Sequence, residues 1–182
     1  KMVMLNSPCN PTGGVYSHSD LQAIADVIAW AGIYVITDEI YEKLLYDGAQ
    51  HISIASLIPE LMNKTLTVNG VSKAYAMTGW RVGYGAGPQD LIANMIKVQS
   101  QETTNTCSIS QYAALEALNG PQGCVETMRQ AFEKRRNQIV EGLNNLPGFQ
   151  CRTPQGAFYA FPDVTKLFGA SSSWGKIESD ID

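Results

Sequence analysis

The feature that most constrains this chain is a repeated unit in which a short apolar run ends in a cluster of polar residues. The runs are Met2–Leu5, Ile33–Ile36 and Thr65–Val68, and they are followed in turn by Asn6-Ser7, Thr37-Asp38-Glu39 and Asn69-Gly70. Apolar runs of this length, bounded by turn residues, are typical of strands buried in a sheet. The sequence therefore predicts strands whose ends carry polar side chains.

A helix is predicted between the first two strands, because Leu21, Ile24, Ala25, Val27 and Ile28 recur at helical spacing up to Gly32. Ser19, followed by Asp20, has the character of a helix cap. The order strand, helix, strand, strand implies parallel pairing with crossover helices in an open α/β sheet. Ligands of such sheets bind beyond the carboxyl ends of the strands.

The second half of the chain changes in composition. A helix is predicted from Ser108 to Leu118, and a charged helix from about Val125 to Leu143. Two further strands are predicted at Phe149–Arg152 and Ala157–Phe161, on either side of Thr153-Pro154-Gln155-Gly156. The predicted fold is therefore α/β: a mostly parallel sheet with flanking helices in residues 1–122, then a linking helix and the start of a smaller α+β domain in residues 123–182.

Composition excludes several classes of function. The 182 residues are 45% hydrophobic and 16% charged, which is enough to bury a core in one domain or one domain and part of another. A net charge of −4 argues against a surface that binds nucleic acid. Four cysteines without C-x-x-C spacing and two histidines predict reduced thiols and no metal site.

No run is long enough to span a bilayer, and the first residues lack the pattern of a signal peptide. We therefore expect a soluble, cytoplasmic protein with no membrane partner. The chain starts at Lys1 inside a strand-like run and stops in a polar stretch, so both ends are expected to be cut from a longer polypeptide.

Three motifs, each after a predicted strand, carry a family resemblance. They are N-S-P-C-N-P-T-G at residues 6–13, T-D-E-I-Y at 37–41 and S-K-A-Y-A-M-T-G-W-R-V-G-Y at 72–84. Together they resemble the fold-type I pyridoxal-phosphate aminotransferases of class I/II, and are most similar to the bacterial aspartate aminotransferase branch. P-Q-G-A-F-Y at 154–159 is similar to a segment of that family's small domain.

The resemblance implies pyridoxal 5'-phosphate as cofactor and gives three residues catalytic roles. Pyridoxal phosphate withdraws electrons, so the protein must hold its ring and supply an amine. Lys73 would carry the cofactor as a Schiff base and then move a proton as the free amine. Asp38 would keep the ring nitrogen protonated, and Tyr41 would donate to the 3′ oxygen. Without the resemblance, these residues read as a surface lysine, a helix cap and a core tyrosine.

Further cofactor contacts are implied for Asn10, Ser72 and Arg81. Asn10 would be the second donor to the 3′ oxygen, and Arg81 and Ser72 would bind the phosphate. The alternatives are a turn former for Asn10 and a surface salt bridge for Arg81. The sequence departs from the family at Gly70, where relatives often have a serine, and this puts one phosphate contact in doubt.

Other side chains are given no chemical role. Trp80 and Tyr84 are expected to pack in the core, His18 and His51 show no partner pattern, and Arg135 and Arg136 are expected at the surface. The family's phosphate loop, its stacking aromatic residue and its arginine for the α-carboxylate fall outside residues 1–182. No arginine occurs from Lys97 to Ser110, which points to the bacterial branch or to a different substrate.

The predicted function is transfer of an amino group between an amino acid and a 2-oxo acid, with aspartate and 2-oxoglutarate as the leading pair. Alternatives are an aromatic or prephenate-type aminotransferase, a carbon–sulfur lyase of the same fold, and the sensor domain of a transcription regulator. The resemblance also implies a homodimer in the full-length protein. The 182 residues alone are expected to be inactive.

Overall fold

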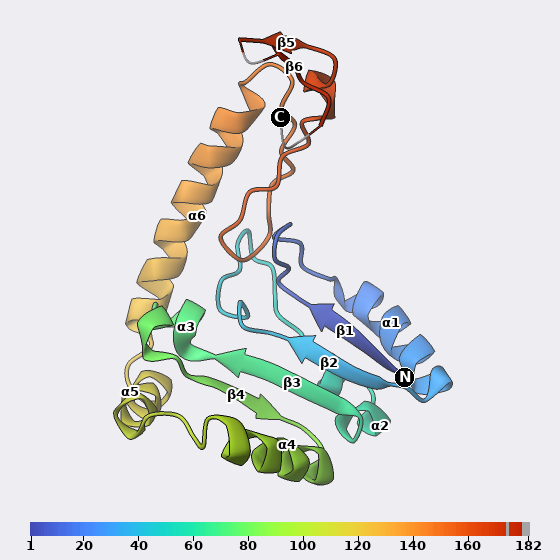
Figure 1. Ribbon diagram of the computed structural model, residues 1–182, viewed down its shortest axis with the longest axis vertical. Helices are drawn as coiled ribbons and strands as arrows, with labels where there is room; N and C mark the ends of the chain where they lie inside the picture. Colours follow the sequence, from blue (N-terminus) through green and yellow to red (C-terminus); the bar gives the residue numbers. More distant parts are fainter. Residues whose placement is uncertain (174, 180–182) are drawn as a thin grey trace.

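A computed structural model describes residues 1–173 and 175–179. It contains a four-stranded sheet in the order β1 (Met2–Asn6), β2 (Tyr34–Asp38), β3 (Thr65–Gly70) and β4 (Gly83–Ala86). β1, β2 and β3 run parallel, and β4 is antiparallel to β3 at the edge (Figure 1). The predicted α/β class, its mostly parallel sheet and its first three strands are confirmed.

The helix between β1 and β2 is α1 (His18–Ala31), as the apolar spacing predicts. Its cap is Ser17 and not Ser19: the Ser17 hydroxyl accepts from the backbone N–H of Asp20, and the Asp20 carboxylate accepts from the N–H of Ser17. Gly32 ends the helix in the left-handed conformation, with a φ of 64°.

One face of the sheet packs on α1, on the short helix α2 (Pro59–Met62) and on the 3₁₀ turn η1 (Ile54–Ser56). The buried residues of this core are Leu5, Leu21, Ala25, Ile28, Val35, Ile54 and Leu61. Each fully buried aliphatic side chain contributes about 1.5–3 kcal/mol of transfer free energy. This core fixes the parallel strands in register and so fixes the positions of the loops that follow them.

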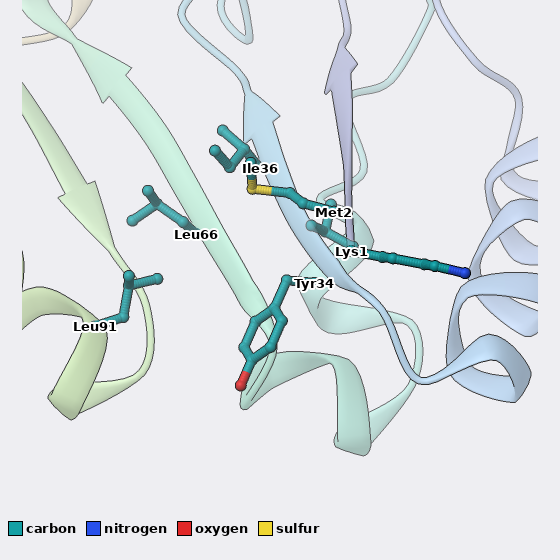
Figure 2. A pocket seen from close by; sticks show the side chains of 7 residues that line it. Lys1, Met2, Tyr34, Ile36, Leu66 and Leu91 are labelled. Atoms are coloured by element: carbon teal, nitrogen blue, oxygen red, sulfur yellow. The ribbon is translucent and has the colours of Figure 1, made fainter.

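The opposite face of the sheet, called here the open face, carries Met2, Met4, Tyr34, Ile36 and Leu66. Side chains alternate along a strand, so these residues point away from α1. Met2, Met4 and Tyr34 are 61%, 69% and 51% exposed, and no helix within the described ranges shields them. The open face has a hollow of about 370 Å³ that Leu91 also lines, and Figure 2 shows the Lys1 amino group pointing away from it.

Two elements near the sheet edge were not predicted. β4 has the sequence Gly-Tyr-Gly-Ala, without an apolar run, and pairs with β3 through its backbone. Its glycines allow close approach: a Cβ on Gly87, just past the strand, would lie 3.0 Å from the Thr65 carbonyl oxygen. The helix α4 (Gln89–Glu102) follows, with no buried residue.

Beyond the sheet lie α5 (Ser108–Asn119) and α6 (Gly123–Asn144), which match the two later helix predictions. α6 extends away from the sheet, and the chain then returns beside the loop after β2 before β5 and β6 lie near the tip of α6 (Figure 1). This last part contains the 3₁₀ turn η3 (Thr165–Leu167) and the short strands β5 (Ser171–Ser172) and β6 (Gly175–Lys176).

The strands predicted at Phe149–Arg152 and Ala157–Phe161 are wrong. Only single bridges form there, between Gln150 and Asp163 and between Gly156 and Leu45. The aromatic residues that suggested a strand pack against rings from other segments, and do not form a ladder. The division into domains at residues 122 and 123 stays a prediction.

Candidate active site

The carboxyl ends of β1, β2 and β3 lie at one edge of the sheet, as parallel pairing requires. Asn6 at the end of β1 is in register with Asp38 at the end of β2. Three segments leave from this edge: the loop that contains Asn10, the turn that contains Tyr41, and the short helix α3 (Val71–Ala74), which contains Lys73 (Figure 1). The common edge predicted for these residues is therefore confirmed, while their chemical roles stay predictions.

The Asp38 side chain lies on the same side of the sheet as the open face, because it follows Ile36 by two residues along the strand. It stands at the carboxyl end of β2. Its Oδ1 accepts from the backbone N–H of Ile40 at 3.1 Å, which is an Asx turn. Within the described residues this is the one hydrogen bond of its side chain. The carboxylate therefore retains acceptor capacity for a cationic partner on the open face.

The loop after β1 is closed by its own backbone. The N–H of Cys9 donates to the Gly14 carbonyl at 2.9 Å, and the N–H of Gly13 donates to the Cys9 carbonyl at 2.8 Å. The Asn6 side chain joins this loop to β2: its Oδ1 accepts from the Asn10 N–H at 2.7 Å, and its Nδ2 donates to the Asp38 carbonyl at 3.2 Å. The Asn10 side chain is exposed and forms no hydrogen bond among the described residues.

Tyr41 is buried, with 3% of its surface exposed, in the turn after β2. Its hydroxyl forms a short hydrogen bond with the hydroxyl of Tyr159. Burial, together with that bond and the Asp38 charge, raises the pKa of Tyr41 well above its usual range. At neutral pH Tyr41 is therefore protonated and able to donate.

Lys73 follows β3 directly and is partly buried. Its Nζ lies 5.2 Å from the centre of the Phe158 ring and 5.7 Å from the centre of the Tyr41 ring. It forms no ion pair within the part of the chain that the structure describes. The amine is thus held by ring faces, in a cation–π arrangement, and is not neutralised by a carboxylate.

Arg81 and Ser72 lie near this edge, but among the described residues they share no hydrogen-bond partner. Arg81 has a φ of 55°, is exposed, and donates through Nη1 to the Thr78 carbonyl at 2.7 Å. A side chain at Gly70 would be excluded, because its Cβ would lie 2.9 Å from the Val82 carbonyl oxygen. The close approach of β4 to β3 therefore favours glycine at this position.

Two aromatic residues at the site had no predicted role. Phe158 and Tyr159 belong to the segment Pro154–Tyr159, which lies between the Asn10 loop and the Tyr41 turn. Their rings contact Tyr41 edge to face, with centroids 5.3 and 5.6 Å away. The P-Q-G-A-F-Y motif marked the segment in the sequence, but its contact with Tyr41 is visible only in the structure.

The prediction that Arg136 lies at the surface is wrong, whereas Arg135 is exposed as expected. Arg136 donates to both oxygens of Asp47, at 2.5 and 2.9 Å, and to the Pro154 carbonyl at 2.8 Å. Its guanidinium also lies 5.0 Å from the Tyr46 ring. Arg136 therefore joins α6 to the loop after β2.

His51 has a partner that its sequence context did not suggest. Its Nε2 lies 2.8 Å from Oε2 of the buried Glu39, whose Oε1 accepts from Ser53 at 2.7 Å and Thr37 at 3.2 Å. Burial alone would raise the pKa of Glu39, but these hydrogen bonds outweigh it and lower the pKa. The network fixes the chain immediately after Asp38.

Glu42 brings a third ligand atom within 4.8 Å of Glu39 and His51, so these three residues are the one possible metal group among the described residues. The oxygens of Glu39 already accept hydrogen bonds, which leaves them poor ligands. The prediction of no metal site stays a prediction.

Trp80 and Tyr84 do not pack in a core, contrary to the prediction. They are 44% and 42% exposed. Both follow α3, in a region whose β4 strand has no buried residue. The cysteines Cys9, Cys107, Cys124 and Cys151 are free thiols, and no helix in the described part of the chain is long and apolar enough to cross a membrane.

The family model for aminotransferase class I and II matches residues 1–177. The chain is 54% identical to aspartate aminotransferase of Geobacillus stearothermophilus over 90% of its own length and 42% of the relative's. It is 47% identical to aspartate/prephenate aminotransferase of Cereibacter sphaeroides, over 99% of this chain and 46% of that protein.

Among solved structures, the aspartate aminotransferase of Rhizobium meliloti superimposes with a TM-score of 0.95 and 45% identity. The match covers 99% of this chain and 46% of that one. The chain thus spans about half the length of the proteins it matches.

Proposed function

We propose that this chain, which belongs to the aminotransferase class I and II family, forms the catalytic centre of a pyridoxal-phosphate-dependent aminotransferase that is longer than 182 residues. The observation that carries the proposal is the position of the Lys73 amine, which lies against Tyr41 at the sheet edge where Asp38 ends β2. The proposed reaction moves an amino group from aspartate to 2-oxoglutarate.

The donor set fits the cofactor chemically. Pyridoxal phosphate has an aldehyde, a ring nitrogen, a ring oxygen and a phosphate, and the site offers a matching group for each. Lys73 would bind the aldehyde, Asp38 the ring nitrogen, Tyr41 and Asn10 the ring oxygen, and Arg81 with Ser72 the phosphate. The unused acceptor capacity of Asp38 supports this assignment, because it faces the open side of the sheet.

When bound, the cofactor supplies an electron sink for the bond broken at the substrate's α-carbon. The chain's own residues do the remaining work. The Lys73 amine would remove the proton from the α-carbon of the amino donor and, in the second half of the reaction, deliver a proton to the α-carbon of the acceptor. Asp38 keeps the ring nitrogen protonated, since a nearby carboxylate favours the cationic form. The rings of Phe158 and Tyr41 flank the amine and would orient it.

Aspartate is the proposed amino donor because two relatives, 54% and 51% identical to this chain, are named aspartate aminotransferase. A specific observation also favours a second candidate: one of the relatives that align over almost the whole chain is named aspartate/prephenate aminotransferase. Prephenate is therefore the proposed alternative amino acceptor.

The proposed longer protein also accounts for the apolar surfaces of the chain. The open face exposes Met2, Met4 and Tyr34, and a contiguous apolar surface of this kind is normally covered. We assign its cover to residues outside these 182. The exposed apolar side chains of α4 and α5, such as Ile96, Ile109 and Tyr112, fit the homodimer that the family resemblance implies. We place the protein in the cytoplasm.

The test is to purify the full-length protein with pyridoxal phosphate and add aspartate with 2-oxoglutarate or with prephenate. Oxaloacetate should form with 2-oxoglutarate, and the rate with prephenate shows whether both acceptors are used. Absence of oxaloacetate with either acceptor, while the cofactor is bound, would contradict the proposed substrate. Absence of cofactor binding would contradict the proposed function as a whole.

A further inference from the structure

Tyr159 contacts Tyr41 across 118 residues of sequence. The two hydroxyls form a hydrogen bond, and the rings meet edge to face with centroids 5.6 Å apart. Tyr41 is almost fully buried and Tyr159 is partly buried. A shared hydrogen bond between two shielded phenols fixes where each hydroxyl proton points.

The backbone that carries Tyr159 is bonded to both neighbouring loops. The N–H of Ala157 donates to the Leu44 carbonyl at 2.9 Å, and the N–H groups of Gln155 and Gly156 donate to the Gly13 carbonyl at 3.0 and 2.9 Å. A Cβ on Gly156 would lie 2.7 Å from the Pro8 side chain, so this contact requires glycine. Tyr159 therefore keeps a fixed position relative to the Asn10 loop and the Tyr41 turn.

A phenol carries a single hydroxyl proton, and this decides which of the two tyrosines donates the hydrogen bond. A tyrosine hydroxyl has one proton to donate, and its oxygen can also accept. If Tyr41 donates to the ring oxygen of the cofactor, its own oxygen is free to accept, and Tyr159 is its one hydrogen-bond partner among the described residues. Tyr159 must then be the donor of the pair.

We propose that Tyr159 is a positioning residue, which donates to the Tyr41 oxygen and so orients and strengthens the hydrogen bond from Tyr41 to the cofactor's ring oxygen. This inference rests on the proposed function. Hydrogen bonds in a chain polarise one another, so a donor at Tyr159 makes Tyr41 a better donor. Tyr159 acts through Tyr41 and need not touch the cofactor.

The charged and titratable groups that face Tyr41 come from three segments. They are the Lys73 amine from α3, the Asp38 carboxylate from β2 and the Tyr159 phenol itself. Burial, the hydrogen bond to Tyr159 and the charges of Tyr159 and Asp38 raise the pKa of Tyr41, so it remains a donor across the neutral range. A shift in the protonation of bound cofactor near neutral pH then reports the strength of its donation.

The experiment uses the full-length protein loaded with pyridoxal phosphate and compares wild type with Tyr159→Phe. The measurement is the pH midpoint of the absorbance change of the bound cofactor. Tyr41 stabilises negative charge on the ring oxygen, so weakening its donation should raise the midpoint, by about 0.5 pH unit for the loss of one neutral hydrogen bond. The turnover number should fall in parallel.

Tyr46→Phe is the matched control. Tyr46 is also buried, and its hydroxyl also donates into the same segment, to the Ala157 carbonyl. Its ring lies against Arg136 and not against Lys73. Tyr46→Phe should therefore lower stability without moving the midpoint.

A second comparison covers the case in which Tyr159→Phe does not fold because it leaves the Tyr41 hydroxyl unpaired. Replacing both partners avoids an orphaned buried group, so Tyr41→Phe/Tyr159→Phe is expected to fold. Because Tyr159 acts through Tyr41, the double variant should have the midpoint of Tyr41→Phe alone. A further shift in the double variant overturns the inference.

The remaining outcomes distinguish a failure of the role proposed for Tyr159 from a failure of the proposed function. An unchanged midpoint in Tyr159→Phe, or an equal shift in Tyr46→Phe, overturns the role of Tyr159 while the proposed function stands. A wild-type protein that binds no cofactor removes the proposed function and the inference with it.

Discussion

Arg136 of α6 and Asp47 of the loop after β2 form a two-pronged ion pair, with nitrogen–oxygen distances of 2.5 and 2.9 Å. The same guanidinium donates to the Pro154 carbonyl, so one side chain holds three segments that are distant in sequence. The Arg136 side chain is 5% exposed, whereas that of Asp47 is 58% exposed. The pair is therefore solvated at one end and shielded at the other.

Arg136→Met should destabilise the full-length protein by about 2 kcal/mol, below the 3–5 kcal/mol typical of a fully buried broken pair, because Asp47 remains hydrated. The measurement is the free energy of unfolding in urea. Arg135→Met is the control: its guanidinium lies 5.7 Å from the Phe132 ring and forms no ion pair among the described residues, so its loss should change stability by less than about 0.5 kcal/mol. Equal effects in both variants would contradict a structural role for the Arg136 pair.

Glu39→Gln should change how stability depends on pH. The pKa of Glu39 is lowered in the folded chain from its ordinary value of 4.5, so the unfolded chain binds more protons in this range. The contribution of ionised Glu39 to the free energy of unfolding is therefore fully present above about pH 5. It is lost as the pH falls through the pKa of Glu39 in the folded chain. The free energy of unfolding should be measured at several pH values below 5. It should fall less steeply with decreasing pH in Glu39→Gln than in wild type. An unchanged slope, matching that of the exposed control Glu60→Gln, would rule out this contribution.

The parallel strands and their polar ends were predictable because both signals are local. Apolar runs identify β1, β2 and β3, and the residues just beyond them then share one edge. β4 was missed because its Gly-Tyr-Gly-Ala sequence has no strand pattern of its own and pairs only because β3 offers an edge. Strand propensity at Ala157–Phe161 was overridden by packing, since Phe158 stacks on Phe132 of α6 at 5.5 Å.

In the candidate site, too, local motifs identify some residues, whereas others are recognised from contacts between distant segments. Lys73, Asp38, Tyr41 and Asn10 were identifiable from motifs beside strand ends. The burial of Arg136 could not be predicted, because its partner Asp47 lies 89 residues away. The sequence also does not distinguish Arg136 from the adjacent Arg135. The role proposed for Tyr159 depends likewise on a contact that no local pattern encodes.

Lys73→Ala should abolish covalent attachment of pyridoxal phosphate to the full-length protein. The amine is the one lysine side chain that follows a strand end beside Tyr41 within the described residues. Borohydride reduction followed by peptide mass spectrometry measures the attachment. Lys43→Ala, which removes an exposed lysine of the Tyr41 turn, is the control and should keep it. Attachment at the same level in Lys73→Ala would show that another lysine carries the cofactor.

Asp38→Asn should retain some bound cofactor but slow transamination by about 10²–10⁴-fold, since a neutral amide does not hold the ring nitrogen's proton. The measurement is the turnover number with saturating cofactor, beside the dissociation constant of the cofactor. Asp26→Asn, an exposed change on α1, should leave both unchanged. Turnover near the wild-type value in Asp38→Asn would mean that the partner of the ring nitrogen is misassigned.

The 182 residues alone should be inactive and prone to aggregate. The open face exposes Met2, Met4 and Tyr34, and the exposed Arg81 with Ser72 offers the phosphate few charge-assisted hydrogen bonds, each worth about 1.5–3 kcal/mol. Cofactor affinity should therefore fall by several powers of ten relative to the full-length protein. Light scattering and oxaloacetate formation, measured on both proteins with excess cofactor, test this. Met4→Lys should improve the solubility of the short chain but destabilise the full-length protein, because the cover proposed for the open face would bury the lysine there. Full-length turnover by the short chain, or a Met4→Lys change that is harmless in both contexts, would contradict the assignment of the open face to an internal surface.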